Sequence, residues 1–366
     1  MKVLITGANG FIGKNLVSHL QELPDMELIK YDINNKISEI KDAIDEIDFI
    51  FHLAGVNRPQ NNKDFYTGNA DFTTELIKII GKRKIPIIMT SSIKATEDSD
   101  YGKSKRMGEE ALINYQGPKY VYRLHNVFGK WCKPNYNSVV ATFCYNIARN
   151  IDISITDPKA KLELIYIDDI VKEFIRVLNT GKPSKKIENY YYIRPVYKTT
   201  VGKLAKSIYF FRDCMNSIYV PNTGNDFVKK LYSTYISYLP VEKTCVSAEK
   251  HSDDRGSFTE LVRTKEAGQF SISSSKPGII RGNHYHHTKT ERFIVVKGKA
   301  KINFTSVIDD SKYEFVVDDE HIKIVTIPVG YTHSIENISQ EEMVLVIWCN
   351  ELYDEQNPDT LFKEVK

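Results

Sequence analysis

The sequence has few cysteines, no excess of charge of either sign and no long hydrophobic run. The cysteines are scattered, odd in number and form no CxxC pair, which favours reduced thiols over a disulfide framework. They are Cys132, Cys144, Cys214, Cys245 and Cys349. No apolar run approaches the roughly 18 residues that cross a bilayer, and the first residues lack the apolar region and cleavage site of a secretory signal. We therefore expect a cytoplasmic protein with no membrane partner.

The overall composition excludes further classes of partner and fold. Lys and Arg number 50 against 47 Asp and Glu, so nothing indicates binding to nucleic acid or to a membrane surface. Hydrophobic residues make up 42% and charged residues 27%, as in a soluble globular protein rather than a disordered one. Because 366 residues exceed one ordinary hydrophobic core, we expect two domains.

Strand and helix patterns alternate over the first two-thirds of the chain. This alternation predicts a Rossmann-like α/β fold, a doubly wound parallel sheet with helices on both faces. The expected strands are residues 2–6, 27–31, 49–53, 85–90 and 120–123. The expected helices include residues 13–22, 37–44, 72–80 and 103–115.

After about residue 245 the pattern changes to short alternating strands separated by Gly, Asp and Pro. Such a pattern without intervening helices predicts an all-β sandwich or barrel. The expected strands are residues 269–273, 293–296, 300–304, 323–327 and 343–348. The tyrosine-rich segment 231–243 is apolar enough to pack against a domain, and we place the domain boundary at its end, between residues 1–243 and 244–366.

A glycine-rich loop follows the first expected strand and opens the first helix. It runs Gly7-Ala8-Asn9-Gly10-Phe11-Ile12-Gly13. Glycines at this spacing let the backbone turn tightly and approach a pyrophosphate, whose charge lies at the helix N-terminus. A glycine-rich loop alone also occurs in ordinary strand-to-helix turns, but its place on the first strand favours nucleotide binding.

A YxxxK motif provides stronger evidence for reductase chemistry. Tyr101 and Lys105 lie one helical turn apart on the same face. An ammonium group there lowers the phenol pKa, so that Tyr101 can pass a proton to a carbonyl oxygen as hydride reaches carbon. Ser92, at the end of the preceding strand, can hold the same oxygen. Chance easily explains the glycine-rich loop, the YxxxK motif or the upstream serine alone, but not all three together.

The residues leave the choice between NAD and NADP open. Asp32 lies at the end of the second strand, 19 residues past Gly13, where an acid usually accepts hydrogen bonds from the ribose hydroxyls of NAD. Lys14 and Lys36 favour NADP, because the ammonium group of either could bind its 2′-phosphate.

Over roughly residues 1–240 these motifs resemble the extended short-chain dehydrogenase/reductase family. The resemblance implies that Ser92, Tyr101 and Lys105 form the catalytic set and that Asn126 faces the substrate. The implied cofactor contacts beyond the glycine-rich loop are Leu53, Ala54, Gly55, Asn69, Tyr101 and Lys105. Sugar-nucleotide dehydratases of this family carry Thr-Asp-Glu or a near variant in the serine region, so Ser91-Ser92-Ile93 argues against dehydration.

Two histidine motifs in the C-terminal third predict a metal site. His284, His286 and Glu291 fit HxH-x4-E-x6-G, and His333 lies in a PxGxxH-x3-N segment. His284 and His286 point to the same side of a strand. Three imidazoles and a carboxylate suit zinc or a similar divalent ion with an open position. Single histidines are common on surfaces and in cores without binding a metal. Two matched motifs make it less plausible that these histidines are of that kind.

These motifs resemble the cupin superfamily, and the segments 254–260 and 278–284 resemble the keto-sugar-nucleotide 3,5-epimerases of rhamnose synthesis. In those epimerases the histidine that matches His284 is the general base and no metal is required. Here His284 also begins the metal motif, so the identity of the base stays open. Tyr331, Lys276 and His287 are the alternatives.

The whole chain, including residues 128–138, closely resembles a family of bifunctional capsular-polysaccharide and O-antigen UDP-sugar epimerase–reductases, the capsular assembling protein F type. The resemblance implies C3 epimerisation of UDP-2-acetamido-2,6-dideoxy-L-arabino-hexos-4-ulose in the cupin domain. NADPH-dependent C4 reduction in the first domain would follow, towards UDP-N-acetyl-L-fucosamine. It also implies a homodimer.

Two other functions remain as alternatives. One is a sugar-nucleotide 4-epimerase that keeps NAD bound and has a structural cupin, which Asp32 favours. The other is a non-catalytic sensor of nucleotide and sugar. The intact Tyr101 and Lys105 weigh against the sensor, because sensors of this fold commonly lose that pair.

Overall fold

The computed structural model describes residues 1–245, 247–356 and 358–365 and divides into two compact units. The first unit comprises Met1–Tyr209 and Lys230–Pro240, and the second comprises Phe210–Lys229 and Val241–Lys366. The division falls within helices α8 (Val201–Met215) and α9 (Asp226–Tyr238). Among the described residues, no helix is long and apolar enough to cross a membrane.

The first unit is built on a seven-stranded sheet with the order β2-β1-β3-β4-β5-β9-β8, in which only β8 runs antiparallel to its neighbour. Its strands are β1 (Lys2–Thr6), β2 (Glu27–Tyr31), β3 (Phe49–His52), β4 (Ile87–Ser92), β5 (Lys119–Leu124), β8 (Lys186–Ile187) and β9 (Tyr190–Tyr191). A smaller sheet has the order β10-β7-β6 and consists of β6 (Asn126–Phe128), β7 (Lys161–Tyr166) and β10 (Tyr197–Thr200). The parallel sheet confirms the expected α/β class.

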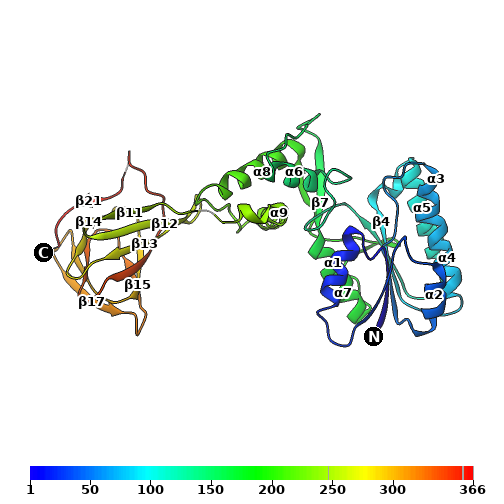
Figure 1. The fold of residues 1–366 in the computed structure, drawn as a ribbon, viewed down its shortest axis with the longest axis horizontal. Coiled ribbons are helices and arrows are strands. Elements are labelled where there is room, and N and C mark those ends of the chain that lie inside the picture. The colour runs from blue at the N-terminus through cyan, green and yellow to red at the C-terminus, as the bar shows by residue number, and fades with distance from the viewer. Residues whose placement is uncertain (246, 357, 366) are drawn as a thin grey trace. The chain divides into compact units, whose positions relative to one another are not determined.

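Helices cover both faces of this sheet (Figure 1). On one face lie α1 (Phe11–Leu20) and α7 (Ile167–Thr180). On the other lie α2 (Ile37–Ala43), α4 (Phe72–Ile80) and α5 (Asp100–Ile113). The remaining helices of this unit include α3 (Lys63–Tyr66), the π-helical turn Thr67–Asp71 and α6 (Val139–Ala148).

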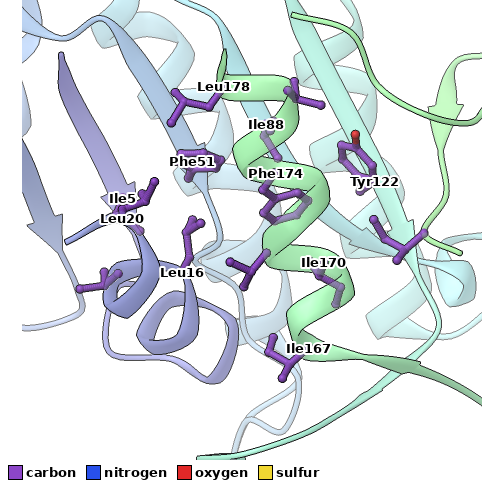
Figure 2. Close-up of a cluster of buried hydrophobic side chains, with 14 of the residues drawn as sticks. Ile5, Leu16, Leu20, Phe51, Ile88, Tyr122, Ile167, Ile170, Phe174 and Leu178 are labelled. Atoms are coloured by element: carbon purple, nitrogen blue, oxygen red, sulfur yellow. The ribbon is translucent and has the colours of Figure 1, made fainter. Parts of the chain in front are cut away.

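Strand periodicity divides the buried side chains between two cores. Val3 and Ile5 belong to the cluster under α1 and α7, whereas Leu4 between them belongs to the cluster on the opposite face. In the first cluster the ring of Phe174, from α7, lies 5.9 Å from Phe51 and 5.2 Å from Tyr122 (Figure 2). Helical spacing places Ile167, Ile170, Phe174 and Leu178 on the same buried stripe. The sheet is therefore anchored on both sides, and its strand ends are fixed.

Besides parts of α8 and α9, the second unit contains two antiparallel sheets around an apolar core, which confirms the expected cupin-like β domain. The six-stranded sheet has the order β11-β12-β13-β20-β15-β18 and the five-stranded sheet has the order β17-β16-β19-β14-β21. The strands are β11 (Lys250–Asp253), β12 (Gly256–Thr264), β13 (Gly268–Ser275), β14 (Ile280–Tyr285), β15 (Glu291–Lys297), β16 (Lys299–Ser306), β17 (Lys312–Asp318), β18 (Ile324–Ile327), β19 (Tyr331–Asn337), β20 (Met343–Cys349) and β21 (Leu361–Phe362).

Candidate functional sites

A cavity of about 830 Å³ lies at the carboxyl ends of the parallel strands in the first unit. Open α/β sheets bind ligands at this edge, outside the strand ends. Of the residues expected to bind cofactor or catalyse, the cavity wall includes Gly7, Asn9, Gly10, Phe11, Ile12, Gly13, Leu53, Gly55, Ser92, Tyr101 and Lys105. The fold thus brings together three segments that are far apart in the sequence.

The glycine-rich loop has the close backbone packing that its sequence suggests. Gly7 has φ +71°, and a Cβ atom there would lie 2.7 Å from the backbone nitrogen of Ala54. A Cβ atom on Gly13 would lie 2.8 Å from the Cα of Ala8. Helix α1 begins at Phe11, directly after these turns. The loop therefore leaves room at a helix N-terminus, which fits the pyrophosphate of a dinucleotide.

Three of the expected cofactor residues do not line the cavity. Asp32 is in contact with the loop itself, because its Oδ2 accepts a hydrogen bond from the backbone N–H of Asn9 at 2.7 Å. Ala54 lies behind Gly7. Asn69 is 2% exposed and bonds to the backbone of Val56 on both its oxygen and its nitrogen. Its nitrogen also donates to the hydroxyl of Ser104 at 3.0 Å, so the Asn69 amide ties the loop after β3 to helix α5 and supports the cavity wall.

The tyrosine of the YxxxK motif is a neutral acid in this structure. Burial raises the pKa of Tyr101, and a hydrogen bond with the side chain of Ser92 lowers it by less. The expectation of a lowered phenol pKa is therefore not met, because desolvation outweighs the polar contact. A phenol that stays protonated near neutral pH can donate its proton to an oxygen that gains negative charge.

Lys105 is buried on the same helix. Burial lowers the pKa of Lys105 to about 8, and the negative charge of Glu109 opposes this effect. Its Nζ would lie 2.7 Å from a Cβ atom on Gly55, so the ammonium group is close to the loop after β3. The charge state of Lys105 consequently changes near physiological pH.

A buried ion pair next to β4 was missed from the sequence. Glu109 is fully buried and accepts hydrogen bonds from Nε and Nη2 of Arg123 at 2.9 and 2.6 Å. Its Oε1 also accepts from the hydroxyl of Ser91 at 2.5 Å. The Arg123 guanidinium lies 3.5 Å from the ring centre of Tyr190. This cluster ties α5 to β4 and β5 next to Ser92.

The rest of the cavity wall is rich in cations. Lys14, Lys94, Lys105 and Lys133 line it, against one carboxylate, Glu97. Asn126, which the family resemblance places against substrate, also lines it. Lys94 had no motif to mark it in the sequence, and Lys133 lies in the segment 128–138 that carries part of the family resemblance. An excess of ammonium groups suits a ligand with several phosphates.

The second unit brings all four expected metal ligands together. His284 lies on β14, His286 directly after it, Glu291 begins β15 and His333 lies on β19. One ligand atom from each lies within 4.8 Å of the others. Antiparallel pairing of β14 and β19 sets His284 opposite His333. Residues from three strands thus converge on one point in the barrel.

The electrostatics of this cluster fit a divalent cation. His286 and His333 are each 1% exposed, and among the described residues their Nε2 atoms have no hydrogen-bond partner. These atoms lie 3.6 and 3.4 Å from Oε2 of Glu291. Burial opposes ionisation of Glu291, yet its pKa is well below the usual value because His286 and His333 face it. Buried nitrogens without partners next to an ionised carboxylate are what a metal site requires.

The three alternative proton-transfer residues differ in position. Lys276 and His287 are exposed, whereas Tyr331 is half-buried and packs against the apolar core. Tyr331 lies two residues before His333 on β19, so both side chains point to the interior of the barrel. Cys349 was also missed from the sequence: its thiol donates to Oε1 of Glu291 at 3.3 Å.

Comparisons with known proteins agree with both units. Residues 3–190 match the NAD dependent epimerase/dehydratase family, and residues 251–361 match the polysaccharide biosynthesis C-terminal domain. A UDP-2-acetamido-2,6-beta-L-arabino-hexul-4-ose reductase from Pseudomonas aeruginosa is 43% identical over 98% of each chain. The spore coat polysaccharide biosynthesis protein SpsL from Bacillus subtilis is 30% identical over 30% of this chain and 80% of its own length.

A solved structure extends this similarity to the fold. The crystal structure of capsular polysaccharide assembling protein CapF from Staphylococcus aureus matches with a TM-score of 0.90 and 44% identity over 100% of both chains. The resemblance to the capsular epimerase–reductases and the fold class expected from the sequence are confirmed.

Proposed function

This chain belongs to the NAD dependent epimerase/dehydratase family, and we propose that it epimerises and then reduces a UDP-linked 4-keto sugar for capsule or O-antigen synthesis. The observation that carries the proposal is the cavity in which Ser92, Tyr101 and Lys105 meet the glycine-rich loop. The separate cluster in the second unit supports a second activity on the same chain.

We assign reduction to residues 1–243. A bound nicotinamide would supply the hydride, held by the glycine-rich loop and the segment after β3. Ser92 and Tyr101 hold the C4 carbonyl oxygen of the sugar, and Tyr101 gives it a proton as negative charge develops. The raised pKa of Tyr101 suits this direction, because the phenol is protonated before the step. The ammonium group of Lys105 stabilises the phenolate that remains.

We assign epimerisation to residues 244–366. Removal of the C3 proton is feasible only next to a carbonyl that can hold the enolate charge. His284, His286, Glu291 and His333 would hold one divalent cation, which we propose is zinc and which would polarise a substrate oxygen. Because His284 belongs to that set, Tyr331 is our candidate for proton transfer at C3.

The two activities require one order. Epimerisation at C3 needs the C4 ketone, and reduction removes it, so epimerisation comes first. The substrate that fits this chemistry and the relatives is UDP-2-acetamido-2,6-dideoxy-L-arabino-hexos-4-ulose, and the product leads towards UDP-N-acetyl-L-fucosamine. We propose that the enzyme acts as a cytoplasmic homodimer.

NADPH is the proposed reductant. Lys14 lines the cavity directly after the last glycine, where its ammonium group can meet a 2′-phosphate. Asp32 already accepts the N–H of Asn9. The same Asp32 favours a second candidate, a 4-epimerase that retains NAD and has a structural cupin, because an acid at the end of β2 can accept from ribose hydroxyls. That enzyme would show no net oxidation of NADPH.

Two variants test the division of labour. Tyr101→Phe should abolish NADPH oxidation on the 4-keto substrate while deuterium from solvent still exchanges at C3. His333→Ala should abolish that exchange. The control is Tyr120→Phe, which removes an exposed hydroxyl bonded to Gly181 and should leave both activities unchanged. If Tyr101→Phe removes exchange and reduction together, with the protein folded, the assignment of one activity to each unit is wrong.

A further inference from the structure

The end of the chain lies against the metal-ligand cluster. Residues 358–365, which we call the C-terminal strap, include β21, whose Phe362 pairs with His284 and whose Leu361 pairs with Tyr285 on β14. The strap continues this pairing, because the N–H of Lys363 donates to the carbonyl of Asn283 at 3.0 Å. The strand that carries His284 is therefore covered by a segment far away in the sequence.

Asp359 holds the turn that joins His286 to Glu291. Its carboxylate accepts hydrogen bonds from the backbone N–H groups of His287, Thr288 and Lys289 at 2.9, 2.6 and 2.8 Å. The hydroxyl of Thr288 donates to the same carboxylate at 2.9 Å. Successive N–H groups that converge on one anion form a rigid, charge-assisted arrangement. The spacing between two of the metal ligands is consequently fixed by a residue some 70 positions away.

The backbone of Asp359 also contacts a metal ligand directly. Its carbonyl oxygen is hydrogen-bonded to Nδ1 of His286. Because a carbonyl only accepts, Nδ1 carries a proton, and in the neutral imidazole the free lone pair is then on Nε2. That Nε2 is the buried atom that faces Glu291. The contact thus selects the tautomer of His286 that can bind a metal.

A second link connects the strap to Glu291. The Nζ atom of Lys289 donates to the hydroxyl of Thr360 on the strap at 3.1 Å and lies 3.8 Å from Oε1 of Glu291. Two of the four ligands, His286 and Glu291, therefore take their orientation in part from the strap.

We propose that Asp359 is a positioning residue for the metal site, and that docking of the C-terminal strap and metal binding strengthen each other. This inference rests on the proposed metal site. Groups that orient metal ligands from behind typically contribute 10–100-fold to metal affinity. Coupling of this kind is reciprocal, so the metal must also stabilise the docked strap.

The first test measures metal affinity in the full-length protein. Competition with a chromogenic chelator should show that Asp359→Ala weakens Zn²⁺ binding about 10–100-fold, and the visible spectrum of the Co²⁺ form should change. The matched control is Asp354→Ala, an exposed aspartate of the same tail that accepts a hydrogen bond from the backbone N–H of Gln356, and its Zn²⁺ affinity should stay within about twofold of the wild type. Unchanged Zn²⁺ affinity in Asp359→Ala would overturn the proposal.

The second test uses the wild-type protein, so it does not depend on how a variant folds. Hydrogen–deuterium exchange of residues 361–365, which contain no ligand, should slow when Zn²⁺ is added. The same exchange rate with and without Zn²⁺ would refute the coupling. His286→Ala separates the metal-site hypothesis from the positioning hypothesis. If the wild type binds Zn²⁺ and His286→Ala does not, the metal site is supported. The measurements on Asp359→Ala and on residues 361–365 then test only whether the strap positions the ligands. If the wild type binds no Zn²⁺, both the metal site and the role of Asp359 are wrong.

Discussion

Replacing Glu109 by glutamine should destabilise the first unit and also shift the pH dependence of reduction. The substitution keeps the volume of the side chain and removes its charge. It leaves the guanidinium of Arg123, only 11% exposed, facing an amide, and it places an N–H₂ group where one of the present acceptors lies. Among the residues that the structure describes, Arg123 forms an ion pair with no other carboxylate.

The expected loss is about 3 kcal/mol. Removing one partner of a buried ion pair costs roughly 3–5 kcal/mol, because the remaining charge is buried without compensation. We take the lower limit, since Arg123 keeps some access to solvent and its contact with Tyr190. With a slope of about 1–3 kcal/mol per molar urea, the unfolding midpoint should fall by roughly 1–3 M.

The effect on pH dependence follows from Lys105. The charge of Glu109 raises the pKa of Lys105 against the larger lowering by burial, which leaves it at about 8. Without that charge the pKa of Lys105 falls further. Because the ammonium form is the one that supports Tyr101, the decline of the reduction rate at high pH should begin at lower pH in Glu109→Gln.

Urea titration in a Trp348→Phe background provides the stability assay. The chain has two tryptophans, so the fluorescence of Trp131 then reports on the first unit alone. Glu110→Gln is the control, because this neighbouring residue is exposed and should change stability by less than about 0.5 kcal/mol. If Glu109→Gln unfolds at the same urea concentration as Glu110→Gln, the buried pair contributes nothing and the reasoning fails.

Two further predictions concern the ligands. Gly13→Ala should weaken NADPH binding at least about tenfold by calorimetry, because a methyl group 2.8 Å from the Cα of Ala8 forces the loop to shift; normal affinity would show that the loop adapts. Elemental analysis should find about one divalent cation per chain, and His333→Ala should lose it; a wild-type protein without metal would rule out the site.

Features that depend on neighbours in the sequence were predictable. The spacing of the glycines, the one-turn separation of Tyr101 and Lys105, and the alternation that sets His284 and His286 on one face all follow from local geometry. The same is true of the fold class, because strand and helix periods differ. Each of these patterns lies within a dozen residues.

Features that depend on distant contacts were not predictable. Glu109 is an ordinary helix residue until the sheet brings Arg123 to it. Asp359 lies in a polar tail whose role becomes visible only when it meets the turn after His286. The pKa of Tyr101 has the same origin: the motif marks the residue, but burial by the whole unit sets the direction of its shift. Asn69 stays a predicted cofactor contact, but its hydrogen bonds to the backbone of Val56, which support the loop after β3, could not be inferred from the motif.

The most direct test is NMR of the product formed in D₂O from the 4-keto UDP-sugar, with NADPH and with NADH. We expect one reduced sugar that carries deuterium at C3, with inverted configuration there and a new hydroxyl at C4, and faster formation with NADPH. A substrate that stays unchanged with either reduced cofactor would contradict the proposed chemistry.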